Sequence, residues 1–321
     1  LDRRNIVARL IRGSIRAERT YQTAEPTHAE RALEDLRLAG SFLEDTSYLL
    51  SRFLNAHLIA ATAYETTNRT EESEIHLSQA GTIANRLATF AGDYEAHRWR
   101  AYYFDHVGDL AQAVTEWRAI DDKTIGFLIM TLYRAGRFDE ALAACDEYGA
   151  TATTGTAEFC HAFVLAATCS HVDELVADFP FGKNFANLSV DAEMRRAHIL
   201  WCLAGQPERA IETVRQVGAT DPPHGQIASR YAYMRGDLSA DEYLQRAANS
   251  RYEQARARFV IGIRQLGRGQ REIARAHFQQ AVDYRFDFNF FTAMSRALLA
   301  QFDRDPHWPT WIVATTAGES E

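Results

Sequence analysis

Residues able to do chemistry are spread thinly along this sequence. The two closest pairs among its eleven histidines are His97 with His106, nine residues apart, and His161 with His171, ten residues apart. A zinc-binding helix places two histidines about four residues apart on one face, so these spacings predict no metal site. Glycine-rich phosphate loops, serine-nucleophile motifs and protein-kinase signatures are also missing from the sequence.

Short clusters of carboxylates and glycines have simple structural explanations. The pairs Glu71-Glu72 and Asp121-Asp122 fall at expected turns or helix starts, where the helix dipole stabilises a negative charge. The Gly-Arg-Gly run at 267–269 falls at an expected helix–helix turn, where glycine ends a helix in the left-handed conformation. We therefore expect no catalytic residue, no cofactor and no bound metal. The remaining catalytic alternative is an enzyme of unrelated α-helical repeat design, whose site is not visible as a motif.

The four cysteines lie in apolar segments without a Cys-x-x-Cys pair. They are Cys145, Cys160, Cys169 and Cys202. Such spacing is typical of buried thiols in a reducing compartment, so we expect a cytoplasmic protein. Lysine occurs only at positions 123 and 183, which leaves 33 of the 35 basic residues as arginine, a bias typical of a GC-rich bacterial genome.

The overall charge argues against two classes of partner for the chain as a whole. Asp and Glu number 43 against 35 Lys and Arg, a formal net charge of −8, which does not suit a surface built to neutralise nucleic-acid phosphates. No stretch of the sequence approaches the run of about 18 apolar residues that a membrane-spanning helix needs. We expect neither nucleic-acid binding nor insertion into a membrane.

The N-terminal segment departs from this acidic balance. Residues 1–19 contain six arginines against Asp2 and Glu18, a net charge of +4. Four of the arginines are spaced by three and four residues and so form one stripe on a helix: Arg9, Arg12, Arg16 and Arg19. This secondary basic stripe could meet an acidic partner, an anionic membrane or a nucleic acid. A solvated face, or a face that packs on an upstream domain, is the simpler interpretation.

Apolar residues recur at i, i+3 and i+4 almost from end to end, which is typical of amphipathic helices. Seven prolines, no Asn-Gly hairpin signal and few alternating β-branched runs give little support for strands, so we expect an all-α fold. Short polar connectors recur about every 33 residues, close to the period of a helix–turn–helix repeat. The connectors are Gly108-Asp109, Gly136-Arg137, Gly205-Gln206, Gly236-Asp237 and Gly269-Gln270, with Asn68-Arg69 and Ser170-His171 as degenerate members.

Small and bulky residues alternate around these connectors in a common register. The unit around Gly108 has Ala101, Phe104, Ala113, Trp117 and Ile120, the unit around Gly205 has Trp201, Ala210 and Val214, and the unit around Gly269 has Gly262, Ala274, Phe278 and Ala281. This pattern resembles the tetratricopeptide repeat (TPR) family over roughly residues 54–302, with about seven degenerate repeats. The resemblance implies a right-handed superhelical solenoid of antiparallel helix pairs. Two units carry Leu175 and Asp241 at the small position, and the family's closing proline is present once, as Pro222.

This interpretation divides the sequence into three parts. Residues 1–53 form N-terminal helices that make a degenerate hairpin and cap, and residues 54–287 form about seven TPR-like helix–turn–helix repeats. Residues 288–321 form a C-terminal capping helix followed by a tail rich in Trp and Pro. Because the prolines interrupt any helix in this tail, we expect Trp308 and Trp311 to fold back onto the last helices.

Residues at the expected helix ends agree with this layout. Asp109 and Asp237 are expected to cap the N-termini of second helices, and Pro207 to lie in a first helical turn. The connecting glycines suit helix C-termini. Connectors this short force neighbouring helices to pack antiparallel.

In the TPR family, the first helix of each repeat lines a concave groove that holds an extended or helical segment of a partner. Carried over by position, the resemblance implies that nine residues line such a groove: Arg98, Tyr102, Asp105, Met130, Tyr133, Arg195, Ile199, Arg230 and Tyr233. Tyr and Arg supply many hot spots of protein interfaces. We therefore expect a protein–protein interaction scaffold or adaptor whose partner is a protein or peptide.

A second interpretation makes the chain one region of a larger protein. It begins at Leu1 without an initiator Met, which fits a processed product or a piece of a longer polypeptide. The array would then be the regulatory or sensory part of a bacterial signalling protein, such as a kinase or a transcription regulator. The intact mass of the native gene product distinguishes the two interpretations.

Overall fold

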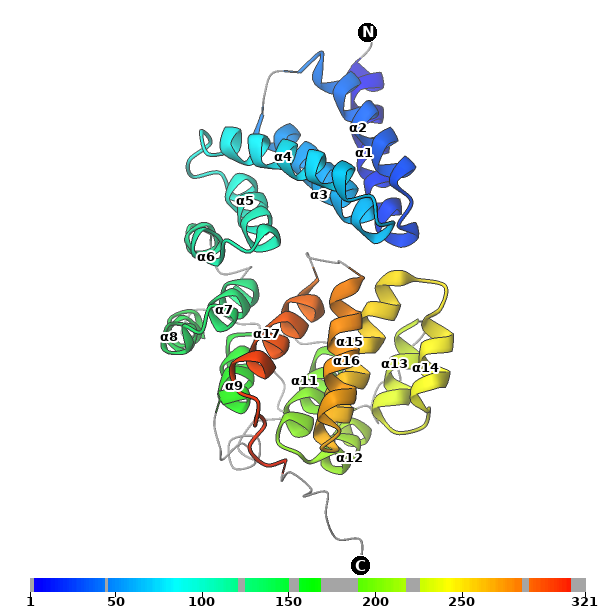
Figure 1. The fold of residues 1–321 in the computed structure, drawn as a ribbon, viewed down its shortest axis with the longest axis vertical. Helices are drawn as coiled ribbons and strands as arrows, with labels where there is room; N and C mark the ends of the chain where they lie inside the picture. The colour runs from blue at the N-terminus through cyan, green and yellow to red at the C-terminus, as the bar shows by residue number, and fades with distance from the viewer. Residues whose placement is uncertain are drawn as a thin grey trace, which may run out of the picture. The chain divides into compact units, whose positions relative to one another are not determined.

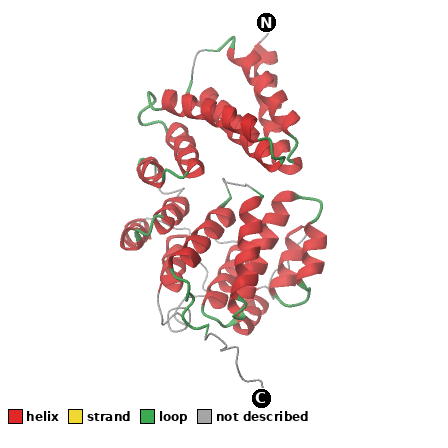
Figure 2. Ribbon diagram, viewed as in Figure 1, coloured by secondary structure: helices red, strands yellow, loops and turns green. Residues whose placement is uncertain are grey.

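The computed structural model describes residues 3–43, 46–120, 125–149, 156–168, 190–217, 226–284 and 289–312. Over these residues it contains sixteen helices and no strand, which confirms the expected all-α fold (Figures 1 and 2). Within the same ranges, no helix is both long and apolar enough to cross a bilayer. Several residues singled out above lie outside the described residues: Asp121, Asp122, Cys169, Ser170, His171, Leu175 and Pro222.

The chain divides into two compact units. The first comprises Leu1–Thr131 with two short segments, Ser250–Tyr252 and Asp283–Asn289. Its helices are α1 (Arg3–Thr23), α2 (Pro26–Gly40), α3 (Ser47–Thr66), α4 (Thr70–Leu87), α5 (Tyr94–Val107), α6 (Leu110–Arg118) and the first part of α7 (Ile125–Arg134). From α1 to α6 each helix packs on the next, and α3 also packs on α1 and α5. Consecutive hairpins therefore share their buried surfaces.

The second unit comprises Leu132–Asn249, Glu253–Val282 and Phe290–Glu321. Its helices are the end of α7, α8 (Phe138–Gly149), α9 (Thr156–Thr168), α11 (Val190–Leu203), α12 (Pro207–Val217), α13 (Gln226–Met234), α14 (Ala240–Ala247), α15 (Arg251–Gly267), α16 (Arg271–Asp283) and α17 (Phe290–Arg304). Helices that follow each other in the chain pack together, including α8 with α9, α11 with α12 and α13 with α14. This neighbour packing is that of a repeat-like helical fold.

Helices approach closely where one of the facing residues is small. Ala113, Ala210 and Ala274 are completely buried. Gly262 of α15 faces α16 so closely that a Cβ atom there would lie 2.7 Å from Cε1 of Phe278. A bulky residue of one helix thus fills the space left by a small residue of its neighbour. This steric complementarity is what the small and bulky positions of the sequence predict.

The connectors turn as their residues predict. The five connector glycines, at 108, 136, 205, 236 and 269, have φ between 71° and 84°, and Asn68 has a φ of 58°. Glycine adopts this left-handed region without steric cost, and asparagine tolerates it. The predicted cap at Asp109 is confirmed, since its carboxylate accepts a hydrogen bond of 3.1 Å from the backbone N–H of Gln112. Pro207 is the first residue of α12, as expected.

The predicted cap at Asp237 is wrong, because α14 begins later. Its N-cap is Ser239, whose hydroxyl accepts a hydrogen bond from the backbone N–H of Glu242. The Glu242 carboxylate in turn accepts one from the backbone N–H of Ser239, at 2.8 Å. The backbone N–H groups of Asp237 and Leu238 both donate to the carbonyl of Ala232, so these two residues belong to the turn after α13. Ser239 is thereby the first residue free to start the helix.

Both ends of the described chain follow the expected outline. Helices α1 and α2 form the N-terminal hairpin, and α17 is the C-terminal helix. Trp308 is buried and packs edge-on against Phe302, with 5.1 Å between ring centroids. The indole Nε1 of Trp311 donates to the carbonyl of Leu203 at 2.9 Å. Trp308 folds back onto the last helix, as predicted, whereas Trp311 lies against the end of α11 and not against the last helices. The division into a cap, seven repeats and a C-terminal part stays a prediction.

Candidate functional site

Most of the residues assigned to a concave groove lie inside the protein. Six of the nine are less than a tenth exposed: Tyr102, Met130, Tyr133, Ile199, Arg230 and Tyr233. Arg98, Asp105 and Arg195 are partly exposed. These six side chains are therefore largely withdrawn from solvent, while the assignment of the nine positions to a partner-binding groove stays a prediction. The physical reason is that large aromatic and aliphatic side chains are stabilised more by filling the space between helices than by facing water.

Tyr102 and Tyr133 show this burial. The ring of Tyr102 lies among three other aromatic rings, with centroids 4.9 Å from Trp117, 5.4 Å from Phe127 and 5.6 Å from Trp99. Tyr133 is completely buried. Burial raises the pKa of both hydroxyl groups well above the ordinary value of tyrosine. Aromatic clusters of this kind contribute to core packing, so these two tyrosines stabilise the fold.

Tyr233 belongs to a buried cluster of the second unit. Its ring stacks on Tyr243 with 5.2 Å between centroids, and the guanidinium carbon of Arg264 lies 4.2 Å from the ring centre. Arg264 also donates from Nη2 to the carbonyl of Met234 at 2.7 Å. Burial raises the pKa of the Tyr233 hydroxyl to about 12. The cation–π contact and the hydrogen bond hold this arginine inside the unit.

Two of the assigned residues, Arg195 and Ile199, line a pocket of the second unit. The pocket has a volume of about 220 Å³ and is formed by residues of α9, α11 and α17. Its lining residues are Phe159, Ala192, Arg195, Arg196, Ile199, Phe290, Phe291 and Met294. The four from α11 are spaced i, i+3, i+4 and i+7, which places them on one face of that helix.

Guanidinium groups lie against aromatic rings in the pocket wall. The guanidinium carbon of Arg195 is 5.6 Å from the ring centre of Phe291, and that of Arg196 is 5.6 Å from the ring centre of Phe159. The electron-rich face of a ring attracts a cation at this distance. The wall therefore combines an apolar surface with two positive groups. None of the eight lining residues is a nucleophile or a general base, so this arrangement is suited to binding.

Sequence reasoning missed the pocket residues that come from other helices. Phe159 belongs to α9, and Phe290, Phe291 and Met294 belong to the start of α17. The α11 face could have been found from its helical spacing, and the adjacent phenylalanines at 290 and 291 are visible in the sequence. No local pattern shows that α17 meets α11, because these two helices are far apart in the chain, whereas α9 is the described helix that precedes α11.

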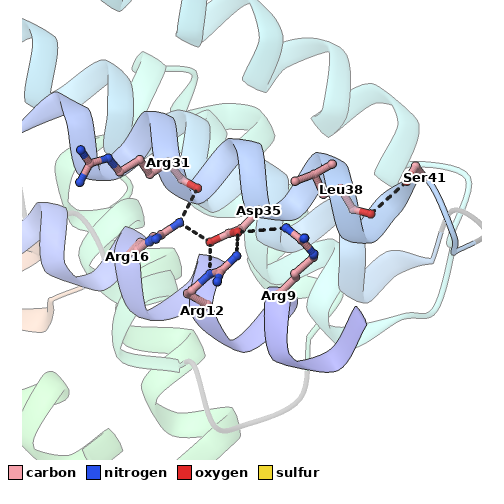
Figure 3. Close-up of polar contacts among 7 residues, drawn as sticks. All are labelled: Arg9, Arg12, Arg16, Arg31, Asp35, Leu38 and Ser41. Carbon is pink, nitrogen blue, oxygen red and sulfur yellow. Dashed lines mark hydrogen bonds and ion pairs between the residues drawn. The ribbon is translucent and has the colours of Figure 1, made fainter. Parts of the chain in front are cut away.

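The predicted arginine stripe of α1 is organised by one carboxylate of α2 (Figure 3). Asp35 is buried and accepts hydrogen bonds from Arg12, through Nε at 2.8 Å and through Nη2, and from Nη1 of Arg16 at 2.5 Å. Arg9 forms an ion pair with it at 3.8 Å. The hydrogen bond from Arg12 and the neighbouring positive charges hold the pKa of Asp35 below its ordinary value, although burial opposes this. The stripe is thus not wholly solvated: Arg9 and Arg16 are partly buried, while Arg12 and Arg19 are exposed.

Two further titratable pairs connect helices of the first unit. His57 and His76 face each other with 3.0 Å between their Nδ1 atoms. Burial, and to a smaller extent the neighbouring His76 ring, lowers the pKa of His57 to about 3. His97 lies with Nδ1 2.7 Å from Oε2 of the buried Glu116. Neither pair belongs to the pocket lining, and both link one helix to the next.

Comparisons with known proteins do not place the chain in a family. No family model matches it, and no curated protein is similar to it in sequence. Its function is therefore inferred from its own residues and their geometry.

Proposed function

We propose that the chain is a protein-interaction module of the TPR kind, a superhelical array from the cytoplasm of a bacterium that binds a peptide segment of a partner. The observation that carries this proposal is the pocket of α9, α11 and α17. Its α11 face includes Arg195 and Ile199, which the repeat register assigns to partner binding. The left-handed connectors and the small–bulky helix contacts support the repeat assignment.

The size of the pocket suits one side chain of a peptide. Sites for drug-sized ligands enclose about 300–1,000 Å³, and this pocket has a volume of about 220 Å³. Phe159, Ile199, Phe290, Phe291 and Met294 are the large apolar residues of its lining. Complete burial of a Leu, Met or Phe side chain contributes about 1.5–3 kcal/mol. We therefore expect the partner to insert one large apolar residue.

The positive groups of the wall favour an acidic residue beside that apolar one. Arg195 and Arg196 both contribute to the lining. A guanidinium group binds a carboxylate through two parallel hydrogen bonds, which adds orientation as well as affinity. The proposed ligand is a peptide segment in which a large apolar residue lies next to Asp or Glu.

Selection of short random peptides on the intact chain tests this proposal. The Kd values of the recovered peptides are then measured by fluorescence anisotropy. Ala192→Phe fills the pocket from its wall, and Ala111→Phe, on the exposed side of α6, is the matched control. We expect peptides with an apolar residue beside an acidic one, bound equally by the parent and the control and at least about ten-fold more weakly by Ala192→Phe.

Three results would contradict the proposal. They are equal binding by Ala192→Phe and the parent, recovery of peptides that share no large apolar residue, and recovery of no peptide at all. Circular dichroism and thermal melting of Ala192→Phe, compared with Ala111→Phe, show that a loss of binding does not come from unfolding.

A further inference from the structure

Helix α1 presents three different faces in the first unit, and its inner face is used by the fold. Gly13 approaches α2 so closely that a Cβ atom there would lie 3.1 Å from Cγ of Leu36. Leu10 packs against the core cluster that contains Leu36, and Ala17 is buried in a cluster with Ile59 of α3. This face attaches α1 to α2 and α3.

The outer face of α1 carries a line of exposed aliphatic side chains. Val7, Ile11 and Ile15 are 54%, 55% and 62% exposed. Because they are four residues apart, they form a line about 12 Å long on one side of the helix. Single exposed aliphatic residues are common on protein surfaces, but a continuous line of three is typical of a contact surface.

The third face is the arginine cluster, which borders the aliphatic line. Arg12 and Arg16 directly follow Ile11 and Ile15 in the sequence, so the charges run along one edge of the line. Together with Arg9, these two arginines carry three positive charges against the one carboxylate of Asp35, a net charge of +2. A guanidinium has five N–H donors, of which Asp35 accepts two from Arg12 and one from Arg16. Donors of both arginines therefore remain for an external anion.

We propose that this outer face of α1 is a docking surface for an acidic amphipathic helix of a partner protein. Apolar residues of that helix, three or four positions apart, cover Val7, Ile11 and Ile15, and its Asp or Glu residues pair with Arg12 and Arg16. The buried carboxylate of α2 holds the two arginines in place before the partner binds, which reduces the conformational entropy lost on binding. The surface uses none of the pocket residues and does not depend on the proposed pocket ligand.

The charges favour this occupant over two others. A second copy of α1 packed against the first would bring six guanidinium groups together with two carboxylates, and like charges repel. An anionic membrane would meet Glu18, which lies three residues from Ile15 and seven from Ile11 on the same side of the helix, in a chain of net charge −8. A partner helix can place its own acidic residues away from Glu18.

Selection of peptides displayed on a helical scaffold, with randomised surface positions, tests the proposal on the intact chain. Recovered peptides are measured by fluorescence anisotropy. The variant Ile11→Ser/Ile15→Ser removes most of the aliphatic line. Its matched control, Ile75→Ser/Ile273→Ser, changes two isoleucines of α4 and α16 that are 50% and 49% exposed. Both variants keep the buried face of every helix unchanged.

A second variant tests the charges. Arg12→Gln/Arg16→Gln/Asp35→Asn removes two guanidinium groups together with the carboxylate, so no buried charge is left unpaired. We expect the recovered peptides to be acidic amphipathic helices that bind the isoleucine control as they bind the parent. Each of the two test variants should bind them at least about ten-fold more weakly. Added NaCl should weaken binding to the parent, because it screens the exposed ion pairs.

Several outcomes would overturn the proposal. These are recovery of no peptide, recovery of peptides without acidic residues, and unchanged binding by Ile11→Ser/Ile15→Ser. The parent could instead dimerise, or bind phosphatidylserine vesicles or single-stranded DNA. Any of these interactions that Ile11→Ser/Ile15→Ser abolished would assign the face to a different occupant. The pocket variant Ala192→Phe should bind the helical peptides normally, so failure of this proposal is distinct from failure of the pocket proposal.

Discussion

Two regions of this protein place arginine beside apolar side chains, and they hold it by different forces. In the first unit, arginines of α1 surround the buried carboxylate of Asp35 and border exposed aliphatic residues. In the second unit, Arg195 and Arg196 lie against the rings of Phe291 and Phe159. A charge pair holds a guanidinium in the first case and a ring face holds it in the second. The arginines of the first unit should therefore respond mainly to loss of their charge partner, and those of the second unit mainly to changes of packing.

Lowering the pH should produce the largest change in the free energy of unfolding, and it sharpens the comparison by testing a buried titratable group. The pKa of His57 is about 3 in the folded protein, below the ordinary 6.5, so the unfolded chain takes up the proton more readily. The stabilisation is complete above about pH 6.5 and is lost as the pH falls toward 3. Between pH 7 and about pH 4.5 the free energy of unfolding should fall by about 2–3 kcal/mol from this group.

The measurement is urea unfolding across that pH range, for the parent and for His57→Gln. Because His198 of the second unit is also buried and its pKa lies well below 6.5, the parent should lose stability in both units. As the pH falls, the free energy of unfolding of His57→Gln should decrease less than that of the parent. Hydrogen exchange should show this difference at the amides of α3 and α4. Identical pH profiles for the two proteins would refute this role of His57.

Overpacking tests the units separately and should have the next largest effect. Ala113 of the first unit and Ala210 of the second are completely buried small residues between helices. Ala113→Leu and Ala210→Leu should each lower the free energy of unfolding by about 1–3 kcal/mol, because the larger side chain displaces its neighbours. Hydrogen exchange should show the loss within the unit that carries the change. Unchanged unfolding in both variants would mean that the small–bulky register is misplaced.

Removal of one carboxylate should have the smallest effect, and only in the first unit. Asp35→Asn should lower the free energy of unfolding by about 1 kcal/mol, since its arginine partners are partly exposed and can be hydrated instead. The control is Asp303→Asn, whose ion pair with Arg275 at 2.5 Å lies on the surface. That change should alter stability by less than about 0.5 kcal/mol. An equal effect of both substitutions, measured by thermal melting, would remove the distinction between an organised arginine cluster and an ordinary surface pair.

Local interactions explain why the helices and most of their ends could be predicted. The left-handed turn at Gly108 and the cap at Asp109 depend on residues within one or two helical turns of each other. The exception is instructive. Asp237 and Ser239 are both good capping residues, and the backbone hydrogen bonds of the connector decide that Ser239 is the cap.

Side-chain burial could not be predicted in the same way. The repeat register places Tyr102 and Tyr133 each on the first helix of its repeat, but it does not show which neighbouring rings cover them. In the structure Tyr102 contacts Trp117 of the next helix and Phe127 beyond it. A tyrosine on a helix face is a contact residue or a core residue according to what packs over it.

The sequence by itself determined the all-α fold, the hairpin connectors and the small–bulky contacts between neighbouring helices, because the interactions that produce them join residues close together in the chain. Only the tertiary structure decided that arginines of α1 meet Asp35 and that Phe159, Arg195 and Phe291 share one pocket. These groups come from different helices, and whether a guanidinium faces a carboxylate, an aromatic ring or water depends on how those helices pack.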